Sequence, residues 1–310
     1  MADYWYGATE RGTAWQKLEE ELTSLPSDTK VILSTELFFA QGEAFVPALQ
    51  QMASSLAHHT VYVVVYLRRQ DRIFSSFYNQ DVKGTRRWAH DAYRFYHTHK
   101  LFEKSYHDRL KLWASVFGRE RLIVRPFEKE QWSGETVVSD FCTAVGLGSL
   151  QGEFAEHNAS LGMVQLHVKR CLNKTGITAE QNTEAVQLLQ ELCPGESIPK
   201  VRYVDAGKYD KLAADWRADN ALVSSEYLDG KPLFHDPIPL ANDVDFYTVP
   251  KFGLAVYLEL MLRHFSEGGS PELRPLFARA TLLAIADLNL WIVAEDGKAE
   301  TLVEWAALGS

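Results

Sequence analysis

The chain has 310 residues, of which 46% are hydrophobic, and this is enough apolar material for one large core or for one domain with an appendage. Its formal net charge of −9 excludes a uniformly basic surface for nucleic acid, although it is compatible with a local basic pocket. No apolar run approaches the roughly 18 residues that a membrane span needs. The composition therefore predicts neither a nucleic-acid partner nor a membrane span.

The cysteine and histidine patterns give no sign of a metal centre. The three cysteines are widely spaced, so they predict neither a zinc site nor a disulfide framework. The histidine groups at 58–59 and 97–99 have no carboxylate or cysteine frame around them. The first residues lack the basic and apolar pattern of a secretory signal. We therefore expect a cytoplasmic protein with reduced thiols and no metal.

The first half of the chain alternates between helices and short apolar strands. The run Val61–Leu67 does not alternate between apolar and polar residues, so we expect a parallel strand covered on both faces. Val31–Ser34 and Arg121–Arg125 predict further strands, and Pro126 ends the latter. Helical spacing is found at 14–25, 44–58, 71–83, 101–117 and 137–145. This order predicts an α/β fold with a parallel sheet covered by helices, which binds ligands at the carboxyl ends of its strands.

The second half of the chain contains helical patterns and little strand signal. Residues 235–248 include two prolines and many polar residues, which indicates a linker. The sequence therefore predicts an α/β domain over 1–235, followed by a linker and a helical C-terminal extension over 236–310. The helices expected in this half are 164–173, 184–192, 209–227, 250–266, 272–293 and 299–308.

The segment Tyr66–Gln80 offers the best candidate for a binding site. The apolar strand delivers Arg68 to its carboxyl end, and Ser76 follows on the next helix. An arginine and a hydroxyl on adjoining elements can grip one phosphate from two directions, and a helix N-terminus adds N–H donors. Spacing alone also fits a solvated helix start with ordinary surface arginines.

This segment resembles the 3′-phosphate-binding segment of the sulfotransferases that use PAPS (3′-phosphoadenosine 5′-phosphosulfate), in particular the bacterial polysaccharide type. The resemblance covers roughly residues 14–235 and implies a P-loop sulfotransferase-like fold in which Arg68 and Ser76 bind the 3′-phosphate. It also implies a polysaccharide or glycolipid hydroxyl as the sulfate acceptor. Further segments that match in order are Ser34-Thr35-Glu36, Tyr78 to Gly84, Arg125-Pro126-Phe127-Glu128, Asp140-Phe141 with Gly146-Leu147, and Tyr227 to Phe234.

Glu36 is the catalytic candidate, because a carboxylate near a strand end can take the proton of an attacking hydroxyl. The alternative for Glu36 is a helix cap or a partner of an arginine. Lys83 and Arg125 can line the nucleotide pocket, although a solvated or structural role is the favoured interpretation of both. Arg69 is expected to add positive charge to this pocket.

The chain departs from the family at the glycine-rich phosphate loop, whose N–H groups and lysine hold the 5′-phosphosulfate. The nearest string, Thr9 to Gln16, contains Gly12-Thr13 but no lysine, and we expect the chain to begin after the place of this loop. The sequence therefore leaves two hypotheses: a sulfotransferase, or a catalytically inactive sulfotransferase-like binding or scaffold protein.

Overall fold

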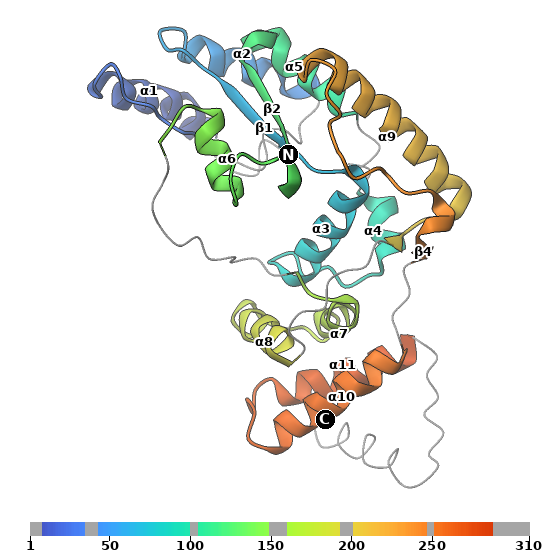
Figure 1. Ribbon diagram of the computed structural model, residues 1–310. Helices are drawn as coiled ribbons and strands as arrows, with labels where there is room; N and C mark the ends of the chain where they lie inside the picture. The colour runs from blue at the N-terminus through green and yellow to red at the C-terminus, as the bar shows by residue number, and fades with distance from the viewer. Residues whose placement is uncertain are drawn as a thin grey trace. The chain divides into compact units, whose positions relative to one another are not determined.

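The computed structural model describes residues 8–34, 43–99, 105–148, 160–192, 201–246 and 251–287. The chain forms two compact units, each made of several separate segments (Figure 1). The first unit takes its described residues from Met1–Arg69, Glu103–Gln151 and Ala214–Ile238. The second takes its own from Gln70–Phe102, Gly152–Ala213 and Pro239–Ser310. The protein is mixed α/β, with mostly helices and little sheet.

The first unit is built on two parallel strands, β1 (Val63–Leu67) and β2 (Leu122–Pro126), as the apolar runs predict. Val65 pairs with Val124, and Leu67 with Pro126, so the carboxyl ends of both strands lie at one edge. The helices of this unit are α1 (Ala8–Ser24), α2 (Val46–Ser55), α5 (Tyr106–Phe117), α6 (Val137–Ala144) and the second part of α9 (Ala206–Tyr227). Figure 1 shows α2 and α5 running beside the strands.

The two faces of the β1–β2 pair differ in burial. Val65, Leu67, Leu122 and Val124 are buried on one face, while residues such as Tyr66 on the other face are only half-buried. The prediction that this strand is covered on both faces is confirmed for the buried face and holds in part for the other. The second face carries polar groups, and these form hydrogen bonds to α6 instead of packing against apolar side chains.

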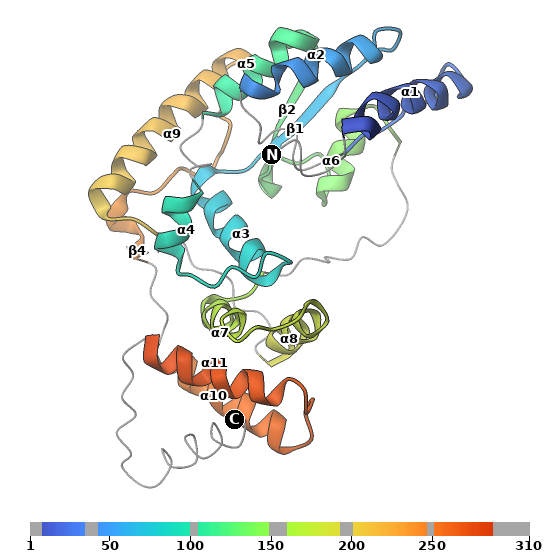
Figure 2. The ribbon, with the colours of Figure 1, turned by 180° about the vertical axis from the view of Figure 1, so that it is seen from behind.

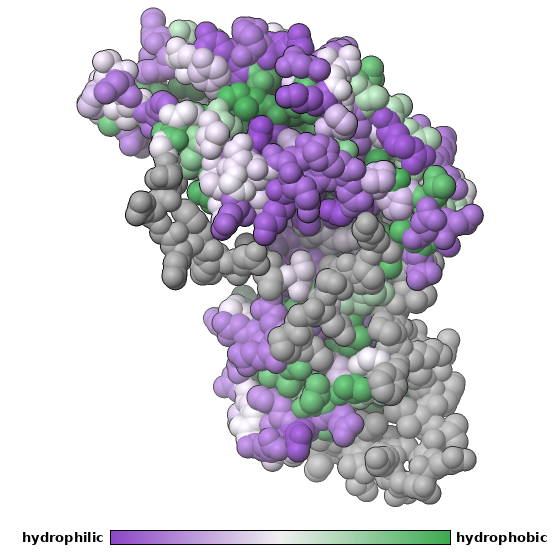
Figure 3. All heavy atoms as spheres, viewed as in Figure 1, coloured by the Kyte–Doolittle hydropathy of each residue, from purple (hydrophilic) through white to green (hydrophobic). Residues whose placement is uncertain are grey.

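The strand predicted at 31–34 is also wrong. These residues belong to no strand, and Val31, Ile32 and Leu33 are 45%, 55% and 50% exposed. An apolar run becomes a strand only where a neighbouring strand offers hydrogen-bond partners, and in the described part of the chain this segment pairs with none. Hydrophobic residues do reach the surface of the first unit between hydrophilic ones (Figure 3).

Local capping sets the helix ends in the first unit. Ser105 caps α5, and Asp219 on α9 accepts hydrogen bonds from the backbone N–H groups of Tyr106 and His107, at 2.7 and 3.1 Å. Gly118 ends α5 with a φ of 87°, as its position after the helical pattern predicts. Thr136 and Ser139 form a capping box at the start of α6.

The second unit is predominantly helical (Figure 2). Its aromatic core joins α3 (Gln70–Lys83) and α4 (Ala92–Thr98), where the rings of Phe74 and Phe95 meet edge-on at 5.6 Å. A short parallel pair is formed by β3 (Val201–Arg202) and β4 (Asp245–Phe246), and β4 lies inside the segment predicted as a linker. The remaining helices are α7 (Met163–Asn173), α8 (Ala179–Leu192), the first part of α9, α10 (Lys251–Ser266) and α11 (Arg274–Asp287).

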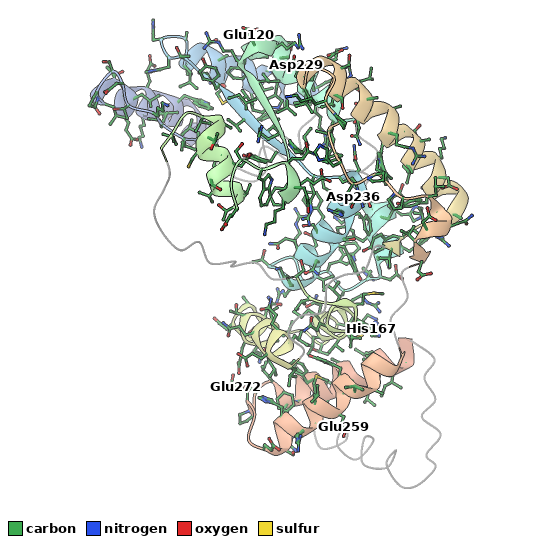
Figure 4. The ribbon with its side chains drawn as sticks, viewed as in Figure 1. Glu120, His167, Asp229, Asp236, Glu259 and Glu272 are labelled. Atoms are coloured by element: carbon green, nitrogen blue, oxygen red, sulfur yellow. The ribbon has the colours of Figure 1, made fainter. Side chains whose placement is uncertain are left out.

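The helices predicted at 250–266 and 272–293 are present as α10 and α11 as far as Asp287. They pack against α7 and α8, so they share a core with residues far earlier in the sequence. His167 points from α7 toward α11, where its Nε2 lies 3.2 Å from the carbonyl oxygen of Ala284 (Figure 4). None of the described helices is both long and apolar enough to cross a membrane.

Candidate functional site

The carboxyl ends of β1 and β2 meet around Arg68. The N–H of Phe127 donates to the carbonyl of Leu67 at 2.6 Å, which extends the parallel pairing past the last strand residue. The guanidinium of Arg68 lies over the ring of Phe127, with its carbon 5.6 Å from the ring centre. The carbonyl of Arg68 accepts from the hydroxyl of Tyr106 at 2.5 Å. The backbone of Arg68 is thus fixed, and its side chain is half-buried at the sheet edge where ligands are expected.

Arg69, the next residue, has a different environment. Its side chain is 2% exposed and forms an ion pair with Asp236 at 2.8 Å (Asp236 is labelled in Figure 4). The same guanidinium donates to the carbonyls of Asp236 and Pro237, at 3.1 and 2.9 Å. These bonds are the arrangement by which a protein keeps a buried charge satisfied. These contacts give Arg69 a structural role, whereas the sequence predicts that it adds positive charge to the nucleotide pocket.

Glu128, which follows β2, binds the backbone of the segment that contains Asp236, the ion-pair partner of Arg69. Its buried carboxylate accepts from the N–H groups of His235 and Asp236, at 2.7 and 3.0 Å, and from Gln131 at 2.6 Å. Burial alone would raise the pKa of Glu128, but the hydrogen bonds from His235 and Asp236 outweigh it and hold the pKa below its ordinary value. We call residues 233–238 the clasp, because Arg69 and Glu128 attach this segment to the ends of both strands.

Arg125 belongs to a second network of hydrogen bonds, which is centred on Asp140. It forms a bidentate pair with the fully buried Asp140 of α6, which also accepts from the hydroxyl of Tyr66 at 2.6 Å and from the N–H of Ser133 at 2.7 Å. The bond to Asp140 raises the pKa of Arg125, and burial together with Asp140 raises that of Tyr66. Burial would raise the pKa of Asp140, but the bonds from Arg125 and Tyr66 lower it below its ordinary value. The network fastens α6 to the half-buried face of the strands.

Ser76 and Lys83 lie on α3, in the second unit. Ser76 is half-buried, and its hydroxyl has no hydrogen-bond partner within the described ranges. Burial lowers the pKa of Lys83 below its ordinary value, and the carbonyl of Lys83 accepts from Asn182 at 2.9 Å. The structure thus brings Arg68, Arg69 and Arg125 together in one unit, and it assigns Ser76 and Lys83 to the other.

The remaining predictions concern the start of the chain. Glu36, the catalytic candidate, lies outside the described residues, as does Thr35. The string from Thr9 to Gln16, the nearest likeness to a phosphate loop, is part of α1. As part of a helix, this string does not form the glycine-rich loop that the family uses for the 5′-phosphosulfate. Among the described residues, no group of three or more His, Cys, Asp or Glu side chains could hold a metal ion.

Sequence reasoning missed the partners that organise this site. Asp236 and the roles of Glu128 and Asp140 were not predicted, and neither was a fully buried lysine, Lys169 on α7. A weak signal was available for Asp140, since it stands among apolar residues of a short helix, where a lone carboxylate needs a buried partner. No comparable signal marks Asp236, which lies in a polar segment.

Comparisons with known proteins add a distant relative and no family. No family model matches the chain, and no solved structure matches it. An uncharacterized protein of Archaeoglobus fulgidus is 26% identical over 188 residues, which is 60% of this chain and 50% of that protein. The chain thus spans about half the length of the curated relative it matches.

Proposed function

We propose that this protein binds a 3′-phosphoadenosine nucleotide at the carboxyl ends of β1 and β2 and acts as a sulfotransferase that uses PAPS. The observation that carries the proposal is Arg68, a half-buried arginine that follows a parallel strand and stands over the ring of Phe127, the residue after the neighbouring strand. An arginine held in this way presents a planar set of N–H donors to a phosphate. The resemblance also implies Ser76, eight residues later in the sequence, as a phosphate ligand.

The proposed reaction is sulfuryl transfer to a hydroxyl group of a polysaccharide or glycolipid. The acceptor oxygen forms a bond to the sulfur of PAPS, and the bond from sulfur to the bridging phosphate oxygen breaks. Adenosine 3′,5′-bisphosphate is then the leaving group. The acceptor proton passes to a general base, and Glu36 is the proposed base. The free and buried thiol of Cys142 suits the cytoplasm as the proposed location.

An inactive nucleotide-binding protein is the second candidate. The observation that favours it is the helical state of Thr9 to Gln16, which leaves the described residues without a glycine-rich loop for the 5′-phosphosulfate. Such a protein would keep the 3′-phosphate site at Arg68 and transfer no sulfate.

The proposal is tested by calorimetric titration with adenosine 3′,5′-bisphosphate. We expect micromolar binding by the wild type and at least about tenfold weaker binding by Arg68→Ala, because a charge-assisted contact to phosphate is lost. Arg263→Ala, at a highly exposed arginine on α10, is the matched control and should bind as the wild type does. A well-folded wild type that does not bind would refute both candidates.

Transfer of labelled sulfate from PAPS then separates the two candidates. With a polysaccharide acceptor, an enzyme should form a sulfated product, and Glu36→Gln should lower turnover by roughly a hundredfold or more while leaving nucleotide affinity unchanged. Binding without any transfer would support the inactive protein instead.

A further inference from the structure

The hydrogen-bond ladder between β1 and β2 ends beside Arg68. The carbonyl of Leu67 still takes part in this pairing, because it accepts from the N–H of Phe127 at 2.6 Å. The next carbonyl, that of Arg68, accepts from the hydroxyl of Tyr106 at 2.5 Å instead. Tyr106 lies at the start of α5 and is 4% exposed, and a carbonyl left without a partner in such a buried place is costly. The hydroxyl of Tyr106 therefore fixes the peptide unit that follows Arg68.

Tyr106 is in turn held by Asp219 on α9. One oxygen of this carboxylate accepts from the N–H of Tyr106 at 2.7 Å. The other accepts from the N–H of His107 at 3.1 Å and from the hydroxyl of Ser105. A carboxylate in this place satisfies N–H groups that have no partner within the helix, and its charge is favourable at a helix N-terminus. The first turn of α5, which carries the ring of Tyr106, is thus anchored from another helix.

The side chain of Arg68 depends on this backbone. Arginine is long and flexible, so a ligand that binds its guanidinium has to restrict many side-chain conformations. Here the peptide units on both sides of Arg68 are fixed, one by Phe127 and the other by Tyr106. The guanidinium also lies over the ring of Phe127, with its carbon 5.6 Å from the ring centre. Part of the ordering that a phosphate would otherwise impose is therefore present before it binds.

We propose that Tyr106 is a positioning residue for Arg68, and that Asp219 acts through Tyr106. The hydroxyl of Tyr106 is bonded to the carbonyl of Arg68, so its contribution to binding passes through the arginine and requires no contact with the nucleotide. The three residues belong to the first unit. The effect on nucleotide affinity rests on the function proposed above, whereas the position of Arg68 can be measured without any ligand.

The first test is the NMR signal of the Arg68 side chain in the full chain without ligand. Protons held over an aromatic ring are shifted upfield, so Phe127 should shift those of Arg68 in the wild type. Tyr106→Phe removes only the hydroxyl, and it should move these signals toward the values of an unrestrained arginine. Tyr66→Phe is the matched control, because it removes the hydroxyl that donates to Asp140 at 2.6 Å and should leave the Arg68 signals unchanged.

The second test is calorimetric titration with adenosine 3′,5′-bisphosphate. Tyr106→Phe should weaken binding about fivefold, because a hydrogen bond that orders Arg68 is lost. In a chain that already carries Arg68→Ala, the same change should have no further effect, since the arginine through which it acts is gone. Tyr66→Phe should bind as the wild type does. A general structural role for Tyr106 would instead weaken binding equally with and without Arg68.

Two outcomes would overturn the inference. The first is an Arg68 signal that is the same in Tyr106→Phe and in the wild type. The second is an equal loss of affinity in the two backgrounds. A wild type that binds no nucleotide, but whose Arg68 signal moves in Tyr106→Phe, would refute the proposed function and support the positioning role.

A second variant covers the case in which Tyr106→Phe does not fold. Asp219→Asn keeps an acceptor oxygen at the start of α5 and removes the negative charge. It should move the Arg68 signal and the affinity in the same direction as Tyr106→Phe, by a smaller amount. An Asp219→Asn protein with both values unchanged would contradict the role of Asp219.

Discussion

Buried charged residues in this protein fall into two groups. Arg69, Glu128 and Asp140 are almost fully buried, and each has partners of opposite charge or several backbone hydrogen bonds. Lys169 is equally buried, but its partners are one neutral amide, that of Asn173, and, at longer range, another cation, Arg87. The first group stabilises the fold once it is formed, whereas the buried charge of Lys169 destabilises it.

Replacing Lys169 should therefore stabilise the protein. The pKa of Lys169 falls from 10.5 to about 7 on folding, so between these values the unfolded chain binds more protons, and stability rises with pH. Lys169→Met should raise the free energy of unfolding by a few kcal/mol near pH 7, and this gain should shrink toward pH 10. Urea unfolding between pH 7 and pH 10 measures this gain in the free energy of unfolding. The control Lys211→Met, at an exposed lysine of the same unit, should show no such trend with pH.

Sequence alone placed Arg68 correctly at a strand end, because the apolar run before it defines the strand. The sequence could not distinguish the role of Arg68 from that of Arg69, because the contacts that make the two adjacent arginines different form only in the folded protein. Asp236, which pairs with Arg69, is remote in sequence. Such partners are set by tertiary contacts, which leave no local pattern. The assignment of nucleotide and acceptor stays a prediction, since it depends on the resemblance.

Among the elements, α6 shows how a short helix is fixed to a sheet. It spans only Val137–Ala144, and helices of this length are marginal in isolation. Its attachment is the network in which Asp140 receives hydrogen bonds from Arg125, Tyr66 and Ser133. The opposite face of the strands is held by apolar packing, so the two faces use different kinds of interaction.

Asp140→Asn should weaken this attachment. The change leaves Arg125 without its carboxylate, and breaking a buried pair typically costs about 3–5 kcal/mol of unfolding free energy. Since the pKa of Asp140 is lowered in the fold, its contribution is present above the ordinary pKa of an aspartate and is lost as the pH falls through the folded value. Urea unfolding should show this loss, whereas the exposed Asp28→Asn should change little; equal effects would contradict the network's role.

Element prediction succeeded where the pattern was long or bounded by a stop signal. The strands at β1 and β2 and the helices at α3, α6, α7 and α10 lie close to their predicted positions. The short helix α4 and the two-residue strands β3 and β4 were missed, because so few residues carry no detectable period. Val31–Leu33 was assigned to a strand on hydrophobicity alone, which does not report whether a pairing partner exists.

At the scale of the whole molecule, each unit has its own core. Phe277 on α11 is fully buried in the second unit, and Leu110 on α5 is fully buried in the first. Replacing either by alanine should cost about 2–5 kcal/mol of stability in the unit that contains it.

Hydrogen exchange identifies the helices and strands in which this stability is lost. Phe277→Ala should speed exchange in α7 and α8, because these helices share its core, and leave β1 and β2 close to wild type. Leu110→Ala should produce the reverse pattern. Uniformly faster exchange through the whole chain in either variant would mean that the two units unfold together as one.

The segmented make-up of the units has a consequence for how the protein is synthesised. Neither unit is continuous along the chain, since the first is completed only by residues 214–238 and the second only by residues after 238. A nascent chain that has grown past β2 therefore has strands but lacks the clasp that Glu128 and Arg69 bind. The early segments of the first unit must stay unaggregated on the ribosome until residues 214–238 have emerged, and this favours shielding of the nascent chain by chaperones.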